Sequence, residues 1–280
     1  MPFLYSTQKL IIYSVSGILL EKFCMRNCII LGSGRSGTSM VAGTLAKAGY
    51  FMGNHLIPAR DGNPKGFFED VEINKVNEEI LAQVLPKRPR FIGRWLFLDR
   101  PLYGQRWLAQ VPVGTKIPSH PQFSEKIKAI IQQKPFCFKD PRFCYTLPLW
   151  LPYLNDVVFV CIFRDPVSTV KSIIKEVKHE PHLHHFSITP QQTLDIWRLM
   201  YSHILEIHQL EGEWLFLHYD QVLNGEGLEK LAAFTEASID YSFPDTSLRR
   251  STQEQPIPKN TERLYQKLCQ LAGYTEAVPT

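Results

Sequence analysis

Hydrophobic residues in this chain gather in short runs, and between the runs they recur with the spacing of helices. Short apolar runs predict strands at residues 28–31, 136–138, 157–163 and 214–218. Two of these runs, CIIL and VVFVCIF, are apolar throughout, which is typical of strands that are buried on both faces. Apolar residues three or four positions apart predict helices at 40–48, 71–85, 125–133, 166–178, 191–210, 227–236 and 261–272.

Strands that alternate with helices in this way predict the α/β class. We expect a three-layer sandwich in which a central parallel sheet lies between two layers of helices. A single α/β domain is expected over residues 27–280, preceded by a poorly packed N-terminal extension, residues 1–26. The apolar run at 10–20 is too short to cross a bilayer, so no integral membrane span is expected. Two polar stretches, 179–189 and 242–260, are expected to be mobile surface loops.

Composition and charge narrow the function classes. Hydrophobic residues make up 44% and charged residues 21% of the 280 positions, which is typical of a globular protein and excludes a disordered or collagen-like chain. With 31 lysines and arginines against 27 aspartates and glutamates, the net charge is +4. This charge suits a small anionic ligand but is too weak to indicate a nucleic-acid partner. The six cysteines form no C-x-x-C pair, which argues against zinc and favours reduced thiols in the cytoplasm.

A glycine-rich turn follows the first predicted strand. Gly32 and Gly37 have the spacing of a phosphate-binding P-loop, in which backbone N–H groups and the following helix N-terminus face an anion. A nucleotide triphosphatase would have a lysine directly after the second glycine, but Thr38 and Ser39 stand here. The positive charge of the turn comes from Arg35 instead. The structural alternative is a serine-rich turn that only caps the helix.

Two later strands end in the same way, with a basic residue followed by Asp-Pro. The basic residues are Lys139 and Arg164. Because the carboxyl ends of parallel strands face the ligand crevice, both should lie beside Arg35 and favour a polyanionic ligand. With Asp165 as the N-cap of the next helix, Ser172 lies where it and Arg164 can face one phosphate. Either basic residue alone could be a solvated charge at a strand end.

These motifs resemble those of the sulfotransferases that use 3′-phosphoadenosine 5′-phosphosulfate (PAPS). The run GRSGT at 34–38 resembles the family's 5′-phosphosulfate loop, and Arg164 with Ser172 resembles its 3′-phosphate motif. The runs GNPKGFFED and KDPR, which begin at Gly62 and Lys139, resemble the bacterial-type branch of the family. At the position where the well-studied cytosolic members have a catalytic histidine, this chain has a proline, so its catalytic base must come from elsewhere.

The resemblance implies an enzyme that transfers a sulfuryl group in line, without a metal, to a hydroxyl or amine acceptor. The residues expected to bind PAPS are Gly34, Arg35, Ser36, Gly37, Thr38, Ser39, Arg164 and Ser172. Arg35 and Lys139 would also stabilise charge that develops during the transfer. Glu69 is the expected base, because the adjacent Asp70 is explained as the N-cap of the next helix.

Several residue assignments stay open. Glu69 could also be a loop carboxylate in water, and His55 and Asp61 are rival bases. Arg142 either lines the acceptor side or pairs with a carboxylate. Two alternatives stay open for three aromatic residues, which either line an acceptor pocket or belong to the core: Trp95, Phe97 and Trp107. The histidines expected in a flexible loop, and not at a metal site, are His179, His182, His184 and His185. Two basic residues near the C-terminus, Arg249 and Arg250, either close over the cofactor or are solvated.

Two other functions also stay open. One is a P-loop nucleotide kinase, against which the missing lysine argues. The other is a non-catalytic module that keeps the nucleotide crevice. For the sulfotransferase, the acceptor class is left open among carbohydrate, lipid, peptide and small metabolite, because acceptor-facing residues lie in variable loops.

Overall fold

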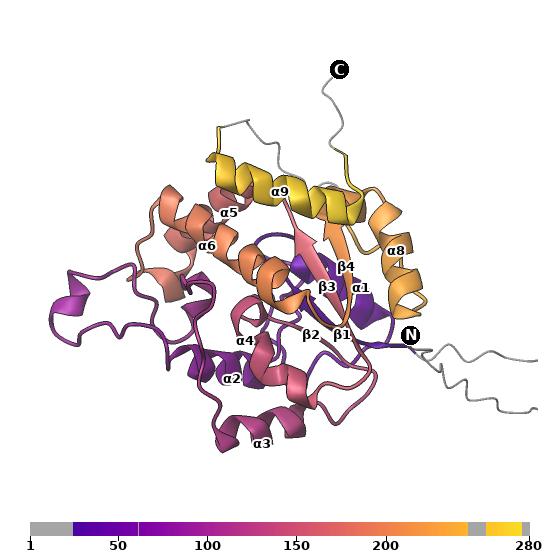
Figure 1. Ribbon diagram of the computed structural model, residues 1–280, viewed down its shortest axis with the longest axis horizontal. Helices are drawn as coiled ribbons and strands as arrows, with labels where there is room; N and C mark the ends of the chain where they lie inside the picture. The colour runs from indigo at the N-terminus through magenta and orange to yellow at the C-terminus, as the bar shows by residue number, and fades with distance from the viewer. Residues whose placement is uncertain (1–24, 61, 246–255, 276–280) are drawn as a thin grey trace, which may run out of the picture.

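Four parallel strands form one sheet in the computed structural model, which describes residues 25–60, 62–245 and 256–275. The strands lie in the order β2-β1-β3-β4 (Figure 1), and their bounds are β1 (Asn27–Leu31), β2 (Cys137–Lys139), β3 (Val157–Phe163) and β4 (Glu213–His218). Ile29 of β1 lies between Phe138 of β2 and Phe159 of β3. The four predicted strands and the parallel sheet are confirmed.

Helices connect the strands. The α-helices are α1 (Thr38–Lys47), α2 (Val71–Leu81), α3 (Pro121–Ile130), α4 (Phe143–Trp150), α5 (Pro166–His179), α6 (Pro190–His203), α7 (Tyr219–Leu223), α8 (Glu226–Thr235) and α9 (Lys259–Ala272). Shorter helical turns are η1 (Ile92–Arg94), η2 (Arg106–Leu108), η3 (Leu151–Tyr153), η4 (Pro181–Leu183) and the π-helical η5 (Ile204–His208). Every predicted helix has a counterpart. Among the described residues, no helix combines the length and apolar character needed to cross a bilayer.

Helix bounds differ from the predictions at several points. The helix predicted to reach residue 210 ends as α6 at His203, where the backbone continues as the π-turn η5. Helix α3 begins four residues early, at Pro121, because the fixed φ of proline suits the first turn of a helix. No prediction covered α4. Its run FCYTLPLW is largely buried and contains Pro148, so it lacks the periodicity of an amphipathic helix.

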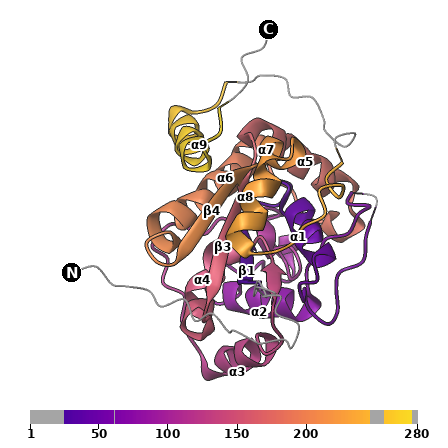
Figure 2. The same cartoon turned by 90° about the vertical axis from the view of Figure 1, so that its right-hand side faces the viewer.

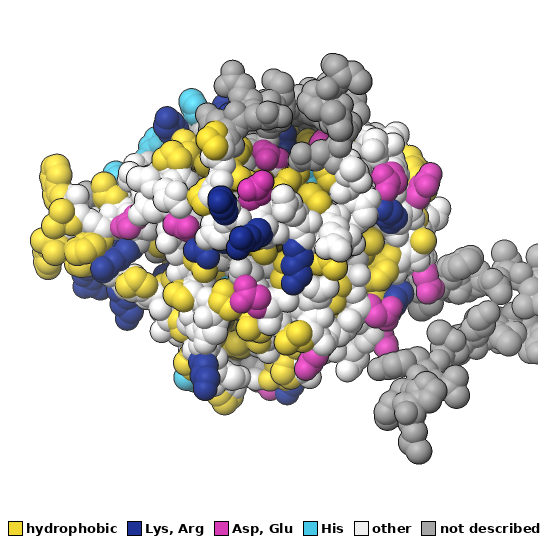
Figure 3. Space-filling view, turned by 45° about the horizontal axis from the view of Figure 1, so that its top comes forward, with side chains coloured by type: hydrophobic (Ala, Val, Ile, Leu, Met, Phe, Trp, Pro, Cys, Tyr) yellow, Lys and Arg dark blue, Asp and Glu magenta, His cyan; other side chains and the backbone are white. Residues whose placement is uncertain are grey.

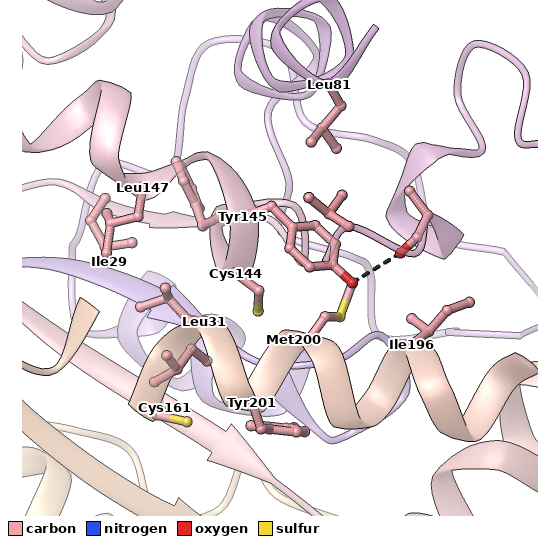
Figure 4. Close-up of a cluster of buried hydrophobic side chains, with 14 of the residues drawn as sticks. Ile29, Leu31, Leu81, Cys144, Tyr145, Leu147, Cys161, Ile196, Met200 and Tyr201 are labelled. Carbon is pink, nitrogen blue, oxygen red and sulfur yellow. Dashed lines mark hydrogen bonds between the residues drawn. The ribbon is translucent and has the colours of Figure 1, made fainter. Parts of the chain in front are cut away.

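Alternate residues of each strand face two hydrophobic layers. Ile30 and Val160 pack with α1, α7 and α8, whereas Ile29 and Cys161 pack with α2, α4, α6 and α9. In Figure 2, α1 lies to the right of the strands and α4 and α9 lie to the left. Figure 4 shows the second layer, in which the Tyr145 hydroxyl donates to the backbone oxygen of Ala109 at 2.9 Å. The three-layer α/β fold is therefore confirmed.

The histidine-rich stretch 179–189, expected to be a mobile surface loop, packs two of its side chains against the core. It contains η4, and its Leu183 and Phe186 are buried in the same layer as α6. Burying each of these apolar side chains stabilises the fold by roughly 1.5–3 kcal/mol. Residues 246–255, most of the second expected loop, lie outside the described residues, as do residues 1–24.

Arg26, the last residue of the expected N-terminal extension, is tied to the folded body. Its backbone N–H donates to the Thr235 backbone oxygen at 3.0 Å. Its Nη1 donates to a Glu213 carboxylate oxygen, also at 3.0 Å. These contacts join the residue before β1 to β4 and α8.

Candidate active site

A pocket of about 680 Å³ lies at the carboxyl ends of β1, β2 and β3. In the order β2-β1-β3-β4 the connection from β1 runs to one side and the next one crosses to the other, and open sheets bind ligands at such a point. The predicted site residues that line the pocket are Gly34, Arg35, Gly37, Thr38, Ser39, Glu69, Lys139, Arg164 and Ser172. Ser36, the remaining predicted residue, is fully buried within the turn.

The turn between β1 and α1 depends on two glycines. Gly32 has a φ of 145°, and a Cβ there would lie 2.2 Å from the Ile162 backbone oxygen. Gly37 has a φ of 96° at the N-cap of α1, where a Cβ would lie 2.5 Å from the Tyr219 ring. Side chains are excluded at both positions by conformation and by space. The glycine spacing therefore reflects how closely the turn approaches β3 and Tyr219.

Tyr201 of α6 holds this turn from behind. Its hydroxyl lies 2.8 Å from the Ile162 backbone oxygen, 3.1 Å from the Ser33 backbone nitrogen and 3.0 Å from the Ser36 Oγ. Burial raises the pKa of Tyr201 well above its usual value, so its hydroxyl stays neutral and can donate. Sequence reasoning missed Tyr201, because on an apolar helix face it resembles any core aromatic residue.

The Arg35 guanidinium connects the turn to α5. Its Nε lies 3.1 Å from the Ser172 Oγ and 3.0 Å from a Glu176 carboxylate oxygen, and its Nη2 donates to the Gly62 backbone oxygen at 3.0 Å. Burial raises the pKa of Glu176, and Arg35 partly offsets this effect. Glu176 was not among the predicted residues. It lies four positions after Ser172, on the same helix face, and that spacing is the signal that could have found it.

Lys139 and Glu69 form a buried ion pair in the pocket wall. The Lys139 Nζ also lies 3.2 Å from the Ser39 Oγ, and the second Glu69 oxygen accepts from the Asn74 Nδ2 at 3.0 Å. Asp70, next to Glu69, accepts from the backbone N–H groups of α2 as its N-cap, as predicted. Glu69 therefore has a structural partner that its position in the sequence did not reveal, and the alternative of a carboxylate in water is wrong.

A second buried network lies behind the Lys139 strand end. The Arg142 Nε donates to Glu78 at 2.7 Å, and its Nη1 donates to Asp140 at 2.9 Å. Arg106 donates to the other Glu78 oxygen at 2.7 Å. Burial lowers the pKa of Arg142, but the two carboxylates outweigh burial and raise it overall. Pairing, one of the two alternatives for Arg142, is confirmed, and the side chain also lines the pocket.

Asp140 also precedes a proline, but it is not the N-cap of a helix. Its Oδ1 accepts from the backbone N–H of Arg142 inside a turn, and α4 begins one residue later, at Phe143. Asp165, which has the same sequence context, is an N-cap: its Oδ1 accepts from the backbone N–H and the hydroxyl of Ser168, each at 2.7 Å. The Asp140 carboxylate instead accepts from the Arg142 Nη1 and from the Asn77 Nδ2, each at 2.9 Å.

Aromatic rings form another part of the pocket wall. A Cβ on Gly34 would lie 2.6 Å from the Trp107 ring, so this glycine and the indole are in close contact. The Arg164 guanidinium carbon lies 4.4 Å from the centroid of the Tyr219 ring, within the range of a cation–π interaction. Trp107 was a candidate pocket residue, whereas Tyr219 was missed. Its position just after the fourth predicted strand could have indicated it.

Other candidates lie away from the pocket. Trp95 and Phe97 are exposed and belong neither to the pocket nor to the core. The His55 side chain is exposed and is not among the residues that line the pocket. Asp61 lies outside the described residues, and so do Arg249 and Arg250.

The histidine-rich stretch contributes one side chain to the pocket. His182 lines it, with its Nδ1 3.2 Å from an Arg60 guanidinium nitrogen, and burial lowers the pKa of its imidazole. Within the ranges that the structure describes, no group of three or more histidine, cysteine, aspartate or glutamate residues could hold a metal ion.

Comparison with known proteins identifies solved structures that share this fold. No protein-family model and no curated protein matches the chain. The sulfotransferase domain of the olefin synthase from Synechococcus PCC 7002 matches with a TM-score of 0.51 and 14% identity, over 90% of this chain and 95% of that domain. The sulfotransferase domain from the curacin biosynthetic pathway matches with a TM-score of 0.50 and 13% identity, over 90% of this chain and 98% of that domain. The chain therefore has the fold of sulfotransferase domains.

Proposed function

We propose that this protein is a sulfotransferase that moves the sulfuryl group of PAPS to a hydroxyl or amine of an acceptor. The observation that carries the proposal is the meeting of both phosphate motifs in one pocket. Arg35 and Ser172, 137 positions apart in the chain, lie within 3.1 Å of each other. Arg164 and Lys139 line the same pocket. Three cationic side chains in one pocket suit a polyanionic ligand, and the shared fold supports the same conclusion.

The two ends of the nucleotide would use different groups. Arg35, the hydroxyls of Thr38 and Ser39, and the backbone N–H groups at the start of α1 would hold the 5′-phosphosulfate. Arg164 and Ser172 would hold the 3′-phosphate. Because Glu176 competes for the Arg35 guanidinium, ligand binding would weaken that ion pair. The aromatic faces of Trp107 and Tyr219 would offer surfaces on which a base can stack.

The transfer itself would depend on Glu69 and Lys139. The acceptor oxygen or nitrogen attacks the sulfur of PAPS while the bond from sulfur to the bridging oxygen breaks, which releases 3′-phosphoadenosine 5′-phosphate. Glu69 takes the proton of the acceptor. Lys139 and Arg35 stabilise the negative charge that develops on the leaving phosphate. The ion pair with Lys139 places the base and this cation on the same wall of the pocket.

Nucleotide selectivity tests the proposal. A ligand that binds only the folded state raises its stability by RT ln(1 + [L]/Kd), about 2.7 kcal/mol at a hundredfold excess over Kd. We expect 3′-phosphoadenosine 5′-phosphate to raise the Tm clearly more than ADP or ATP does. Arg164→Ala should weaken this binding by roughly one to two orders of magnitude, since a hydrogen bond to a charged group contributes about 1.5–3 kcal/mol. Lys171→Ala, an exposed change on the same helix, is the control.

The same measurement separates the other functions. A nucleotide kinase would be stabilised by ATP at least as strongly as by the 3′-phosphorylated nucleotide, and that result would overturn the proposal. A non-catalytic module would show the selective rise in Tm but no sulfuryl transfer across a panel of carbohydrate, lipid, peptide and small-metabolite acceptors.

A further inference from the structure

An apolar tip projects from the segment that joins α2 to α3. We define the apolar tip as Phe91, Ile92, Trp95, Leu96 and Phe97. These side chains are 90%, 53%, 82%, 56% and 39% exposed, respectively. The segment extends from the left of the molecule in Figure 1, and Figure 3 shows hydrophobic side chains at that extremity with lysine and arginine side chains next to them. Trp95, one of the most exposed of these residues, is of a type that folded proteins usually cover.

The exposure of the apolar tip is built into the fold, because the base of the segment is fastened by hydrogen bonds. The Arg88 guanidinium donates to the backbone oxygens of Leu98 at 2.8 Å, Arg100 at 2.7 Å and His185 at 2.7 Å. The backbone N–H of Ser187 also donates to the Leu98 oxygen, at 3.0 Å. The segment is thus tied to the packed histidine-rich stretch, and its large apolar side chains are held away from the core.

Positive charge is concentrated in the same segment. Residues 87–100 contain five lysines and arginines and one aspartate. The resulting net charge of +4 equals that of the whole chain, so the other 266 residues together are neutral. The aspartate, Asp99, accepts from the Gln192 side chain at 3.2 Å. The cationic character of this protein is therefore a local property of the segment that carries the apolar tip.

We propose that the apolar tip inserts into the surface of a bilayer that contains anionic lipids. Tryptophan, phenylalanine, leucine and isoleucine beside lysine and arginine are the composition of interfacial anchors, in which apolar side chains enter the acyl boundary and cations face lipid phosphates. Each basic residue near an anionic surface adds roughly 1 kcal/mol, a factor of about five in binding. The positive charge beside the tip complements anionic lipid headgroups, and this complementarity favours a bilayer over an apolar groove of a partner protein. This inference does not depend on the proposed function.

Vesicle flotation of the full chain tests the inference. The protein should float with vesicles of equal parts phosphatidylcholine and phosphatidylglycerol, and much less with phosphatidylcholine alone. The double variant Phe91→Ser/Trp95→Ser should lose at least about tenfold in binding, since burying an aromatic side chain contributes roughly 1.5–3 kcal/mol. Leu210→Ser is the matched control, because Leu210 is 76% exposed but lies far along the chain, before β4. All variants contain residues 1–24, so a difference in vesicle binding between them is caused by the substitutions in the apolar tip and not by those residues.

A second measurement places the tip in the bilayer directly. Brominated lipids should quench the fluorescence of Trp95, and Trp95→Phe should remove this quenching while the protein still floats. Two outcomes would overturn the inference: no binding to anionic vesicles, or equal binding by the double variant and the Leu210→Ser control. If the wild type does not bind vesicles, and light scattering shows that it self-associates through the apolar tip, the tip is an interface between proteins.

Discussion

At the scale of single residues, the pocket contains charged groups whose partners lie far away in the sequence. Lys139 and Glu69 are 70 positions apart and nearly fully buried together. Desolvating two charges is costly, so a buried pair persists only when each partner is neutralised and hydrogen-bonded. Asn74 and Ser39 supply these additional hydrogen bonds. If one partner is removed, the other is left buried and charged.

Replacing Glu69 by glutamine tests its role as the base. Glu69→Gln preserves the shape of the side chain, and we expect affinity for 3′-phosphoadenosine 5′-phosphate to change little. Turnover should fall by about 10²–10⁴-fold, the usual contribution of a general base. Glu72→Gln, an exposed change on α2, is the control. Near-wild-type turnover in Glu69→Gln would remove Glu69 from the role.

At the scale of the elements, local signals identified the helices and the starts of two of them, but not every helix end. Asp165 and Asp70 accept from backbone N–H groups at the starts of α5 and α2, as their positions in the sequence predict. The end of α6 has no such local signal. There the backbone widens into the π-turn η5, which buries His208 and places its Nε2 2.9 Å from the Cys144 backbone oxygen.

His208 should make the folded state sensitive to acid. Burial lowers its pKa to about 4, whereas the unfolded chain has the usual value near 6.5. The unfolded state therefore binds more protons between these values, and stability decreases as the pH falls through this window. Between pH 7 and pH 5, protonation of His208 should lower the free energy of unfolding by about 2 kcal/mol, since each pKa unit corresponds to 1.36 kcal/mol. Urea unfolding of wild type and His208→Gln at both pH values measures the difference.

The His208→Gln variant keeps a donor near Cys144 but cannot titrate, so its stability should depend less on pH. The exposed His184→Gln variant should respond to acid like the wild type. Equal acid sensitivity of His208→Gln and the wild type would show that the burial of this imidazole does not control the effect. Protons bound by other groups, including the nearby His203, contribute to all three proteins and cancel in the comparison.

At the scale of the whole molecule, the pocket is assembled from several separate parts of the chain. The network of Arg142 joins the turn after β2 to Glu78 of α2 and, through Arg106, to η2. Tyr201 of α6 holds the turn after β1 from the other side. The crossing order of the strands brings these parts to one edge of the sheet. The position of the pocket therefore follows from the topology.

Breaking the Arg142 network should destabilise the entire fold. Arg142→Met leaves Glu78 and Asp140 buried with one cation fewer, a loss of roughly 3–5 kcal/mol in the free energy of unfolding. Arg142→Lys should rescue little, because an ammonium group cannot serve two carboxylates with the geometry of a guanidinium. Arg198→Met, which removes an i,i+3 pair with Asp195, should cost at most about 1 kcal/mol. Urea unfolding measures all three, and a small effect of Arg142→Met would contradict this account of the network.

The sequence by itself determined the features that short stretches of chain decide: the strands, most of the helices, the glycine turn and the caps at Asp70 and Asp165. The strands, helices and caps depend on periodicity or on residues within a few positions, so their physical cause lies inside the stretch. The glycine turn is visible in the sequence as a spacing, although its glycines are required by the close approach of β3 and Tyr219. Only the tertiary structure decided which charges are paired. The contact of Arg35 with Glu176, the anchoring of the turn by Tyr201 and the exposure of the apolar tip all depend on residues brought together by packing. No local spacing records those contacts, because they form only when the sheet order places distant segments side by side.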